Sequence, residues 1–168
     1  MGETKLKGSP VQLVGEFPRK GVKAIDFTLV KGDLSTLRLS ELKGKYVVLN
    51  IFPSLDTSVC ATSVRRFNQL ATNLPNTEVL CISRDLPFAQ SRFCVAEGVK
   101  NVTTLSDFHL YSTFGRDYGV LMMDGPLSGL LARAVVVIDT EGKVMYTELL
   151  PEITHEPDYE AVVNVLNK

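Results

Sequence analysis

The chain has 168 residues and a formal net charge of −1, from 18 basic and 19 acidic side chains, which suits one globular domain over residues 1–168. Its Lys and Arg residues form no cluster long enough to follow a phosphate backbone, which argues against a nucleic-acid partner. Residues 1–10 lack the apolar core of a signal peptide, and no apolar run approaches the roughly 18 residues of a membrane span. We therefore expect a cytoplasmic protein with no membrane partner.

Short strands and turns are predicted for the first third of the chain. Apolar residues on either side of Gly8-Ser9-Pro10 indicate a β-hairpin over residues 5–14. Two more short strands flank a Lys31-Gly32-Asp33 turn, at residues 27–30 and 36–39. Ser40 is suited to cap a helical turn that ends at Gly44.

The rest of the chain alternates strands with helices. Residues 46–52 are almost continuously apolar and β-branched, the signature of a strand buried on both faces of a sheet. A polar loop at 54–58 leads to a helix at 59–73 with apolar residues at helical spacing. Asp85 is suited to cap the next helix. The other predicted elements are a strand at 77–83, a helix from Pro87 to Gly98, a strand at 102–105, a helix at 107–118, an irregular segment at 121–131, a hairpin of strands at 134–138 and 144–150, and a helix at 157–166.

This order of elements predicts an α/β fold. The alternation in the middle of the chain implies parallel strands with helices on the faces of the sheet. The hairpin near the C-terminus makes the sheet mixed. The layout is that of a thioredoxin-like domain, a mixed sheet flanked by helices, preceded by an N-terminal β-hairpin.

The three cysteines, Cys60, Cys81 and Cys94, are an odd number in a chain long enough to fold without disulfides. This count does not fit a secreted disulfide framework, and in a reducing compartment a disulfide between two of them would be transient and catalytic. Cys81 lies inside the predicted strand 77–83, and we interpret it as a core thiol.

Cys60 lies at the start of a helix, just after the carboxyl end of the buried strand 46–52. Free backbone N–H groups and the helix dipole favour an anion there, and the thiolate is the nucleophilic form of cysteine. The alternative is a structural cysteine, because cysteine is among the most buried residue types.

Pro53 and Thr57 precede Cys60 in a Pro-x-x-x-Thr-x-x-Cys pattern. Thr57 lies three residues before Cys60, so one helical turn puts its hydroxyl, which can both donate and accept, beside the sulfur. Pro53 rigidifies the loop and would shield a thiolate from water. Alone, Thr57 is equally consistent with a plain helix cap and Pro53 with a strand terminator; their joint spacing with Cys60 favours a reactive site.

This pattern resembles the active-site signature of the peroxiredoxins, and the surrounding segment is similar to the bacterial thiol peroxidase branch. The resemblance covers nearly the whole chain. Its blocks are residues 50–61, 63–68, 85–94, 132–139 and 152–160.

The resemblance implies a thiol-dependent peroxidase that acts on hydrogen peroxide or an alkyl hydroperoxide without a metal or other cofactor. Cys60 would be the peroxidatic cysteine, and Cys94 would resolve its sulfenic acid as an intrachain disulfide. Arg133 would lie beside Cys60, stabilise the thiolate and polarise the O–O bond. Because the two Cα atoms of a disulfide lie within about 7 Å, we expect local unwinding of one or both cysteine helices.

Two partners are also implied by the resemblance. One is thioredoxin, as the reductant of the disulfide. The other is a second copy of the chain, in a homodimer for which the apolar residues within 110–131 are candidates.

The residues themselves leave alternatives open. Cys94 is also consistent with a packed thiol, and Arg133 with a surface charge whose stem is buried. A disulfide-exchange enzyme or chaperone of the same fold is disfavoured by the missing Cys-x-x-Cys motif. A redox-sensing module would form the Cys60–Cys94 disulfide once, without turnover. A cysteine hydrolase has less support, because His109 and His155 are not placed near Cys60, and neither has a partner at metal-ligand spacing.

Overall fold

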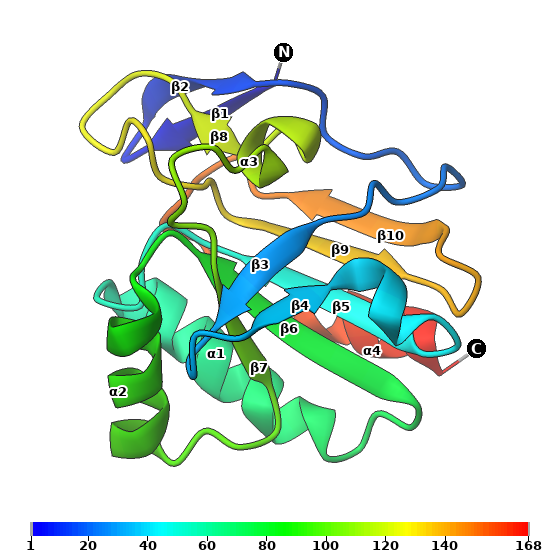
Figure 1. The fold of residues 1–168 in the computed structure, drawn as a ribbon. Helices are drawn as coiled ribbons and strands as arrows, with labels where there is room; N and C mark the ends of the chain where they lie inside the picture. The colour runs from blue at the N-terminus through cyan, green and yellow to red at the C-terminus, as the bar shows by residue number, and fades with distance from the viewer. Residues whose placement is uncertain (1, 168) are drawn as a thin grey trace.

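A seven-stranded mixed sheet forms the centre of the molecule (Figure 1), in the order β10-β9-β5-β6-β7-β3-β4. The computed structural model describes residues 2–167, so the ends of the predicted domain, residues 1 and 168, lie outside this range. The strands of this sheet are β3 (Thr28–Lys31), β4 (Thr36–Arg38), β5 (Tyr46–Ile51), β6 (Thr77–Ser83), β7 (Thr103–Ser106), β9 (Ala134–Ile138) and β10 (Val144–Leu149). The parallel pairs β5–β6 and β6–β7 and the antiparallel β9–β10 hairpin confirm the predicted mixed α/β sheet.

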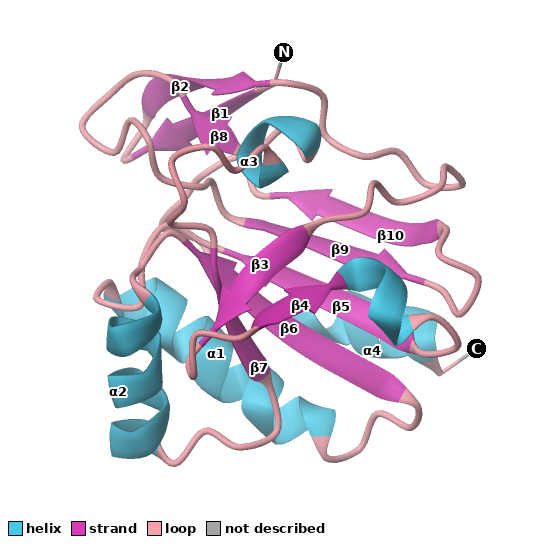
Figure 2. Ribbon diagram, viewed as in Figure 1, coloured by secondary structure: helices cyan, strands magenta, loops and turns pink. Residues whose placement is uncertain are grey.

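A smaller three-stranded sheet carries the N-terminal hairpin. β1 (Glu3–Leu6) pairs with β2 (Ser9–Val14), which confirms the predicted hairpin, and β2 pairs on its other edge with β8 (Leu121–Met122). β8 lies in the segment that was predicted to be irregular. The small sheet and α3 lie together at the top of the view in Figure 2.

The helices are α1 (Ser58–Ala71), α2 (Pro87–Glu97), α3 (Phe114–Asp117) and α4 (Tyr159–Leu166), with a short 3₁₀ turn at Leu39–Leu42. In Figure 1, α1 and α4 lie behind the large sheet. Within residues 2–167, no helix is both long and apolar enough to cross a membrane.

Side chains of β5 alternate between two apolar cores. Leu49 and Ile51 belong to the core on the side of the small sheet, and Val48 belongs to the core that also contains Cys60 of α1 and Val162 of α4. This alternation follows from the two-residue period of a strand. The strand is therefore buried on both faces, as its continuous apolar run predicts.

Three local predictions are wrong. The helix predicted at 107–118 is confined to Phe114–Asp117, because the buried Asp107 carboxylate accepts a hydrogen bond from Ser112 Oγ, an interaction of the kind that competes with helix formation. Ser40 lies inside the 3₁₀ turn, which Arg38 precedes, and so does not cap it. Leu86, and not Asp85, is the residue that precedes α2 as its cap.

Candidate active site

Cys60 lies in the first turn of α1 and is 0% exposed. Its carbonyl accepts a hydrogen bond from Ser63 Oγ at 2.8 Å, and Asn50 Nδ2 donates to the same hydroxyl oxygen at 3.2 Å. Asn50 lies on β5, so the turn that carries Cys60 is tied to the central strand.

Arg133 is a charged partner of this sulfur. The side chain is 1% exposed, and its Nη2 donates to Cys60 Sγ at 2.9 Å. Nε donates to the carbonyl of Ile153 at 2.6 Å, which fixes the guanidinium plane. The third nitrogen, Nη1, is buried and has no hydrogen-bond partner among residues 2–167. A buried cation with one unpaired donor is suited to bind a polar substrate.

A pocket of about 740 Å³ opens beside this pair. Pro53, Thr57 and Arg133 are among the residues that line it, so Arg133 contacts both the pocket and the buried sulfur. The remaining walls are mainly apolar. They include Leu6, Pro10 and Val11 of the hairpin, Val59 of α1, Pro126 and Leu127 of the loop after β8, and Ile153.

Pro53 and Thr57 occupy the loop between β5 and α1, as the sequence pattern predicts. Pro53 is buried, whereas Thr57 is exposed and is the residue that caps α1. The Thr57 hydroxyl donates to the carbonyl of Ser54 at 3.0 Å and not to the sulfur. Its side chain nevertheless lines the same pocket as Arg133.

Cys94 lies on α2 and packs, partly buried, against the apolar core that contains Cys60. Its Sγ lies 3.9 Å from Thr104 Oγ1, and burial raises the pKa of this thiol. All three cysteines are free in the structure.

Cys81 lies in the core, as predicted from its place in a strand. It is fully buried, and this burial raises the pKa of its thiol to about 12. Asn50 Nδ2 lies 3.7 Å from its sulfur. A thiol with so high a pKa is present as the unreactive protonated form at neutral pH.

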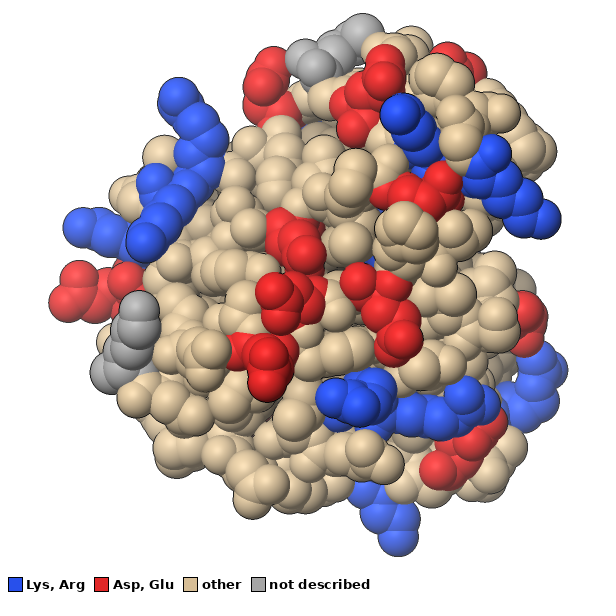
Figure 3. All heavy atoms as spheres, turned by 180° about the vertical axis from the view of Figure 1, so that it is seen from behind, with Lys and Arg blue, Asp and Glu red and all other residues tan. Residues whose placement is uncertain are grey.

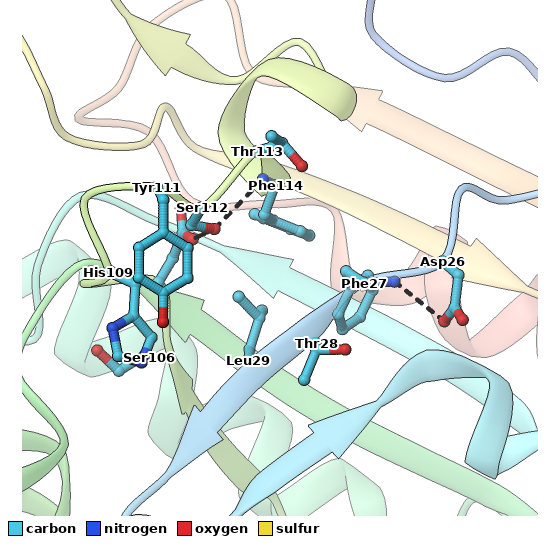
Figure 4. A pocket seen from close by; sticks show the side chains of 11 residues that line it. Asp26, Phe27, Thr28, Leu29, Ser106, His109, Tyr111, Ser112, Thr113 and Phe114 are labelled. Atoms are coloured by element: carbon cyan, nitrogen blue, oxygen red, sulfur yellow. Dashed lines mark hydrogen bonds between the residues drawn. The ribbon is translucent and has the colours of Figure 1, made fainter.

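A second hollow, of about 330 Å³, lies over β3 and the loop before α3 (Figure 4). Of the described residues, no cysteine or arginine lines it. The ring of His109 stacks on that of Tyr111 at its edge, and burial raises the pKa of the Asp107 carboxyl. This hollow therefore lacks the nucleophile and the cation that the first pocket has.

Neither histidine belongs to a cluster of candidate metal ligands in the part of the chain that the structure describes. Within residues 2–167, no group of three or more His, Cys, Asp or Glu side chains is arranged to hold a metal ion.

On the side opposite to the view of Figure 1, acidic side chains gather near the middle of the face, and basic ones are dispersed around them (Figure 3). This face presents no continuous basic surface.

Sequence reasoning missed two residues that support the site. Asn50 interrupts an apolar strand, which is a readable signal, because a polar side chain in a buried strand needs hydrogen-bond partners. The contact between Arg133 and the carbonyl of Ile153 has no such signal in the sequence, because every residue carries a backbone carbonyl.

Comparisons with known proteins show what the chain resembles. The redoxin family model matches residues 19–163. The chain is 52% identical to a thiol peroxidase of Corynebacterium glutamicum over 99% of this chain and 100% of that protein. It is 54% identical to a thiol peroxidase of Mycobacterium tuberculosis over 99% of both chains.

Solved structures give the same result. A peroxiredoxin-like protein from Aquifex aeolicus superposes with a TM-score of 0.92 at 44% identity, over 98% of this chain and 95% of that one. A thiol peroxidase from Chromobacterium violaceum shares the fold, with a TM-score of 0.90 at 24% identity over 99% and 96% of the two chains.

Proposed function

The chain belongs to the redoxin family and is a peroxiredoxin-type peroxidase, and from this premise we propose that it reduces hydrogen peroxide and organic hydroperoxides through Cys60 and Cys94. The observation that carries the proposal is the 2.9 Å contact between Arg133 Nη2 and Cys60 Sγ. A buried guanidinium at this distance would stabilise negative charge on the sulfur that attacks a peroxide.

In the first step, the Cys60 thiolate attacks the terminal oxygen of the hydroperoxide. An S–O bond forms and the O–O bond breaks, which leaves a sulfenic acid on Cys60 and an alkoxide or hydroxide that takes a proton from water. Arg133 remains protonated throughout, so it stabilises the developing charge without transferring a proton. Thr57 and Pro53 line the pocket that would hold the peroxide.

The apolar walls of the pocket support organic hydroperoxides as substrates alongside hydrogen peroxide. A pocket of about 740 Å³ is much larger than hydrogen peroxide needs. An alkyl or aryl group would lie against Leu127 and the hairpin residues, while its hydroperoxide end reaches Arg133.

In the second step, the Cys94 thiolate attacks the sulfenic sulfur, and hydroxide leaves and is protonated to water. Cys60 is fully buried in α1, and Cys94 lies on another helix with its sulfur near Thr104. We propose that the two sulfurs meet after local unwinding of α1, α2 or both.

A thioredoxin-type dithiol then reduces the disulfide by thiol–disulfide exchange and returns both cysteines to the free state. We also propose that the chain acts in the cytoplasm, as one domain, and as a homodimer. Leu110 and Tyr111, which are 96% and 81% exposed, supply apolar surface of the kind that such a contact would cover.

Peroxide-dependent oxidation of NADPH, coupled through thioredoxin and thioredoxin reductase, tests this function. The wild-type protein should sustain turnover with hydrogen peroxide and with cumene hydroperoxide, and Cys60→Ser should abolish it. Cys81→Ala is the matched control and should remain active. Full activity of Cys60→Ser, or no peroxide consumption by the wild type, would overturn the proposal.

A further inference from the structure

Asp85 lies between β6 and α2, but its carboxylate is turned toward the loop that precedes Cys60. Oδ2 accepts a hydrogen bond from the backbone N–H of Leu55 at 2.8 Å, and Oδ1 accepts one from Ser54 Oγ at 2.7 Å. Leu55 and Ser54 stand 30 and 31 residues before Asp85 in the chain. One side chain thus holds two consecutive residues of the loop that runs from Pro53 to Thr57.

The same carboxylate is itself held in place from the sheet. Ser83 Oγ, at the end of β6, donates to Oδ2 at 2.6 Å. The backbone carbonyl of Asp85 accepts a hydrogen bond from Ser106 Oγ, at the end of the neighbouring strand β7. Asp85 is therefore a rigid support, because both its side chain and its backbone are attached to the ends of parallel strands.

A further hydrogen bond extends this network into α2. Gln90 is fully buried, and its Nε2 donates to Ser83 Oγ at 3.1 Å and to the carbonyl of Leu105 at 2.9 Å. Gln90 and Cys94 are four residues apart and so share a face of the helix. The network therefore connects the loop before Cys60 with the helical turn before Cys94.

We propose that Asp85 is a positioning residue for the peroxidase reaction. Its carboxylate fixes Ser54 and Leu55, and thereby the neighbouring residues Pro53 and Thr57, which line the same pocket as Arg133. The inference rests on the proposed function, in which this pocket holds the peroxide. Asp85 does not touch the reacting atoms; it acts through the loop.

The position of this loop matters for the rate of the first step. Displacement of a substrate-positioning group by about 1 Å can cost up to roughly a hundredfold in rate. The carboxylate of Asp85 accepts from three donors, which are Ser54 Oγ, the Leu55 N–H and Ser83 Oγ. In an asparagine, the amide NH₂ replaces one carboxylate oxygen and cannot accept, so at least one of these hydrogen bonds is lost and the loop is held less firmly. Reduction of the disulfide is a later step, in which the loop no longer positions a peroxide.

The test separates the two half-reactions in Asp85→Asn. The second-order rate constant for oxidation of the reduced protein by hydrogen peroxide is expected to fall by about 10-fold to 100-fold. The rate constant for reduction of the disulfide by thioredoxin is expected to stay close to that of the wild type. Asp139→Asn is the matched control, since Asp139 Oδ1 also accepts two backbone N–H bonds, from Glu141 and Lys143, in the turn between β9 and β10. It should leave both rate constants unchanged.

Ser54→Ala supplies a second variant, which keeps the carboxylate but removes the hydroxyl that donates to it and that accepts from the Asp56 N–H at 3.1 Å. It should reduce the oxidation rate constant less than Asp85→Asn does. In the Asp85→Asn background it should cause a smaller loss than in the wild type, because the two residues share one hydrogen bond.

An unchanged oxidation rate in Asp85→Asn, an equal fall in both half-reactions, or fully additive losses in the double variant would overturn the inference. These outcomes leave the proposed function standing as long as the wild type consumes peroxide through Cys60. A wild-type protein that does not react with peroxide overturns both.

Discussion

Ile51 and Ala134 are register partners at the end of the antiparallel pair β5–β9. Cys60 follows Ile51 after one loop and one half-turn of helix, and Arg133 directly precedes Ala134. This register therefore brings the guanidinium to the same edge of the sheet as the sulfur, over a separation of 73 residues in the chain. The proposed reactivity of Cys60 therefore depends on this strand pairing as well as on the local sequence.

The first prediction concerns Arg133→Lys. A lysine keeps the charge but cannot donate to Cys60 Sγ and to the carbonyl of Ile153 from one rigid plane. The rate constant for oxidation of Cys60 by peroxide should fall by about 10-fold to 100-fold, in line with the loss of one fixed donor at a reacting centre. Stopped-flow oxidation with excess peroxide measures it. Arg38→Lys, at an exposed position on β4, is the control. An unchanged rate in Arg133→Lys would show that charge alone suffices.

The second prediction concerns the wall of the pocket. Leu127→Ala removes apolar surface that an organic hydroperoxide would contact but hydrogen peroxide would not. The value of kcat/KM for cumene hydroperoxide should fall by about tenfold, while that for hydrogen peroxide should change little. Hydrogen peroxide serves as the internal control in the same preparation. An equal fall for both substrates would argue against this wall as the binding site of the organic group.

The third prediction concerns the pH dependence of disulfide formation. Burial raises the pKa of the Cys94 thiol, so most of the protein carries protonated Cys94 at neutral pH. Because the thiolate is the attacking form, and its fraction rises about tenfold per pH unit below the pKa, formation of the disulfide should speed up as the pH rises between about 6 and 8. Rapid acid quench and mass spectrometry follow this step. A rate that falls over this range would contradict the assignment.

The fourth prediction concerns stability at Asp107. Burial raises the pKa of this carboxyl in the folded protein, so the folded state holds the proton to a higher pH than the unfolded chain does. Ionised Asp107 therefore lowers stability at neutral pH, and this loss disappears below about pH 4, where the carboxyl is protonated in both states. Asp107→Asn keeps an acceptor for Ser112 and should raise the Tm at neutral pH but not at acidic pH. Thermal unfolding followed by circular dichroism checks this. A lower Tm of the variant at neutral pH would refute it.

Much of the fold is readable from local pattern. The apolar run at β5, the helical spacing in α1 and the left-handed Gly98 at the end of α2 each predict an element that the structure contains. The helix predicted at 107–118 failed because its pattern does not reveal that Asp107 is buried and bonded to Ser112. The secondary structure of such a segment depends on its tertiary contacts, and the periodicity of apolar residues does not reveal those contacts.

The same limit applies to the candidate site. Pro53, Thr57 and Cys60 are close in sequence, so their spacing already places them in one loop and turn. Asp85 is a good helix cap by residue type, and its real partners, Ser54 and Leu55, follow from the pairing of β5 with β6. A carboxylate can accept a hydrogen bond from a side chain or from a backbone N–H group, and the sequence does not indicate which of these donors lies next to Asp85.

The most direct test of the two-cysteine mechanism is a disulfide map after one equivalent of hydrogen peroxide. The reduced wild-type protein, Cys60→Ser and Cys94→Ser are each treated, alkylated, digested and analysed by mass spectrometry. The wild type should contain the Cys60–Cys94 disulfide with Cys81 alkylated, and Cys94→Ser should carry a sulfenic acid on Cys60 without that disulfide. Cys60→Ser should keep both remaining thiols. A disulfide that contains Cys81, or oxidation of Cys94 in Cys60→Ser at the wild-type rate, would contradict the account.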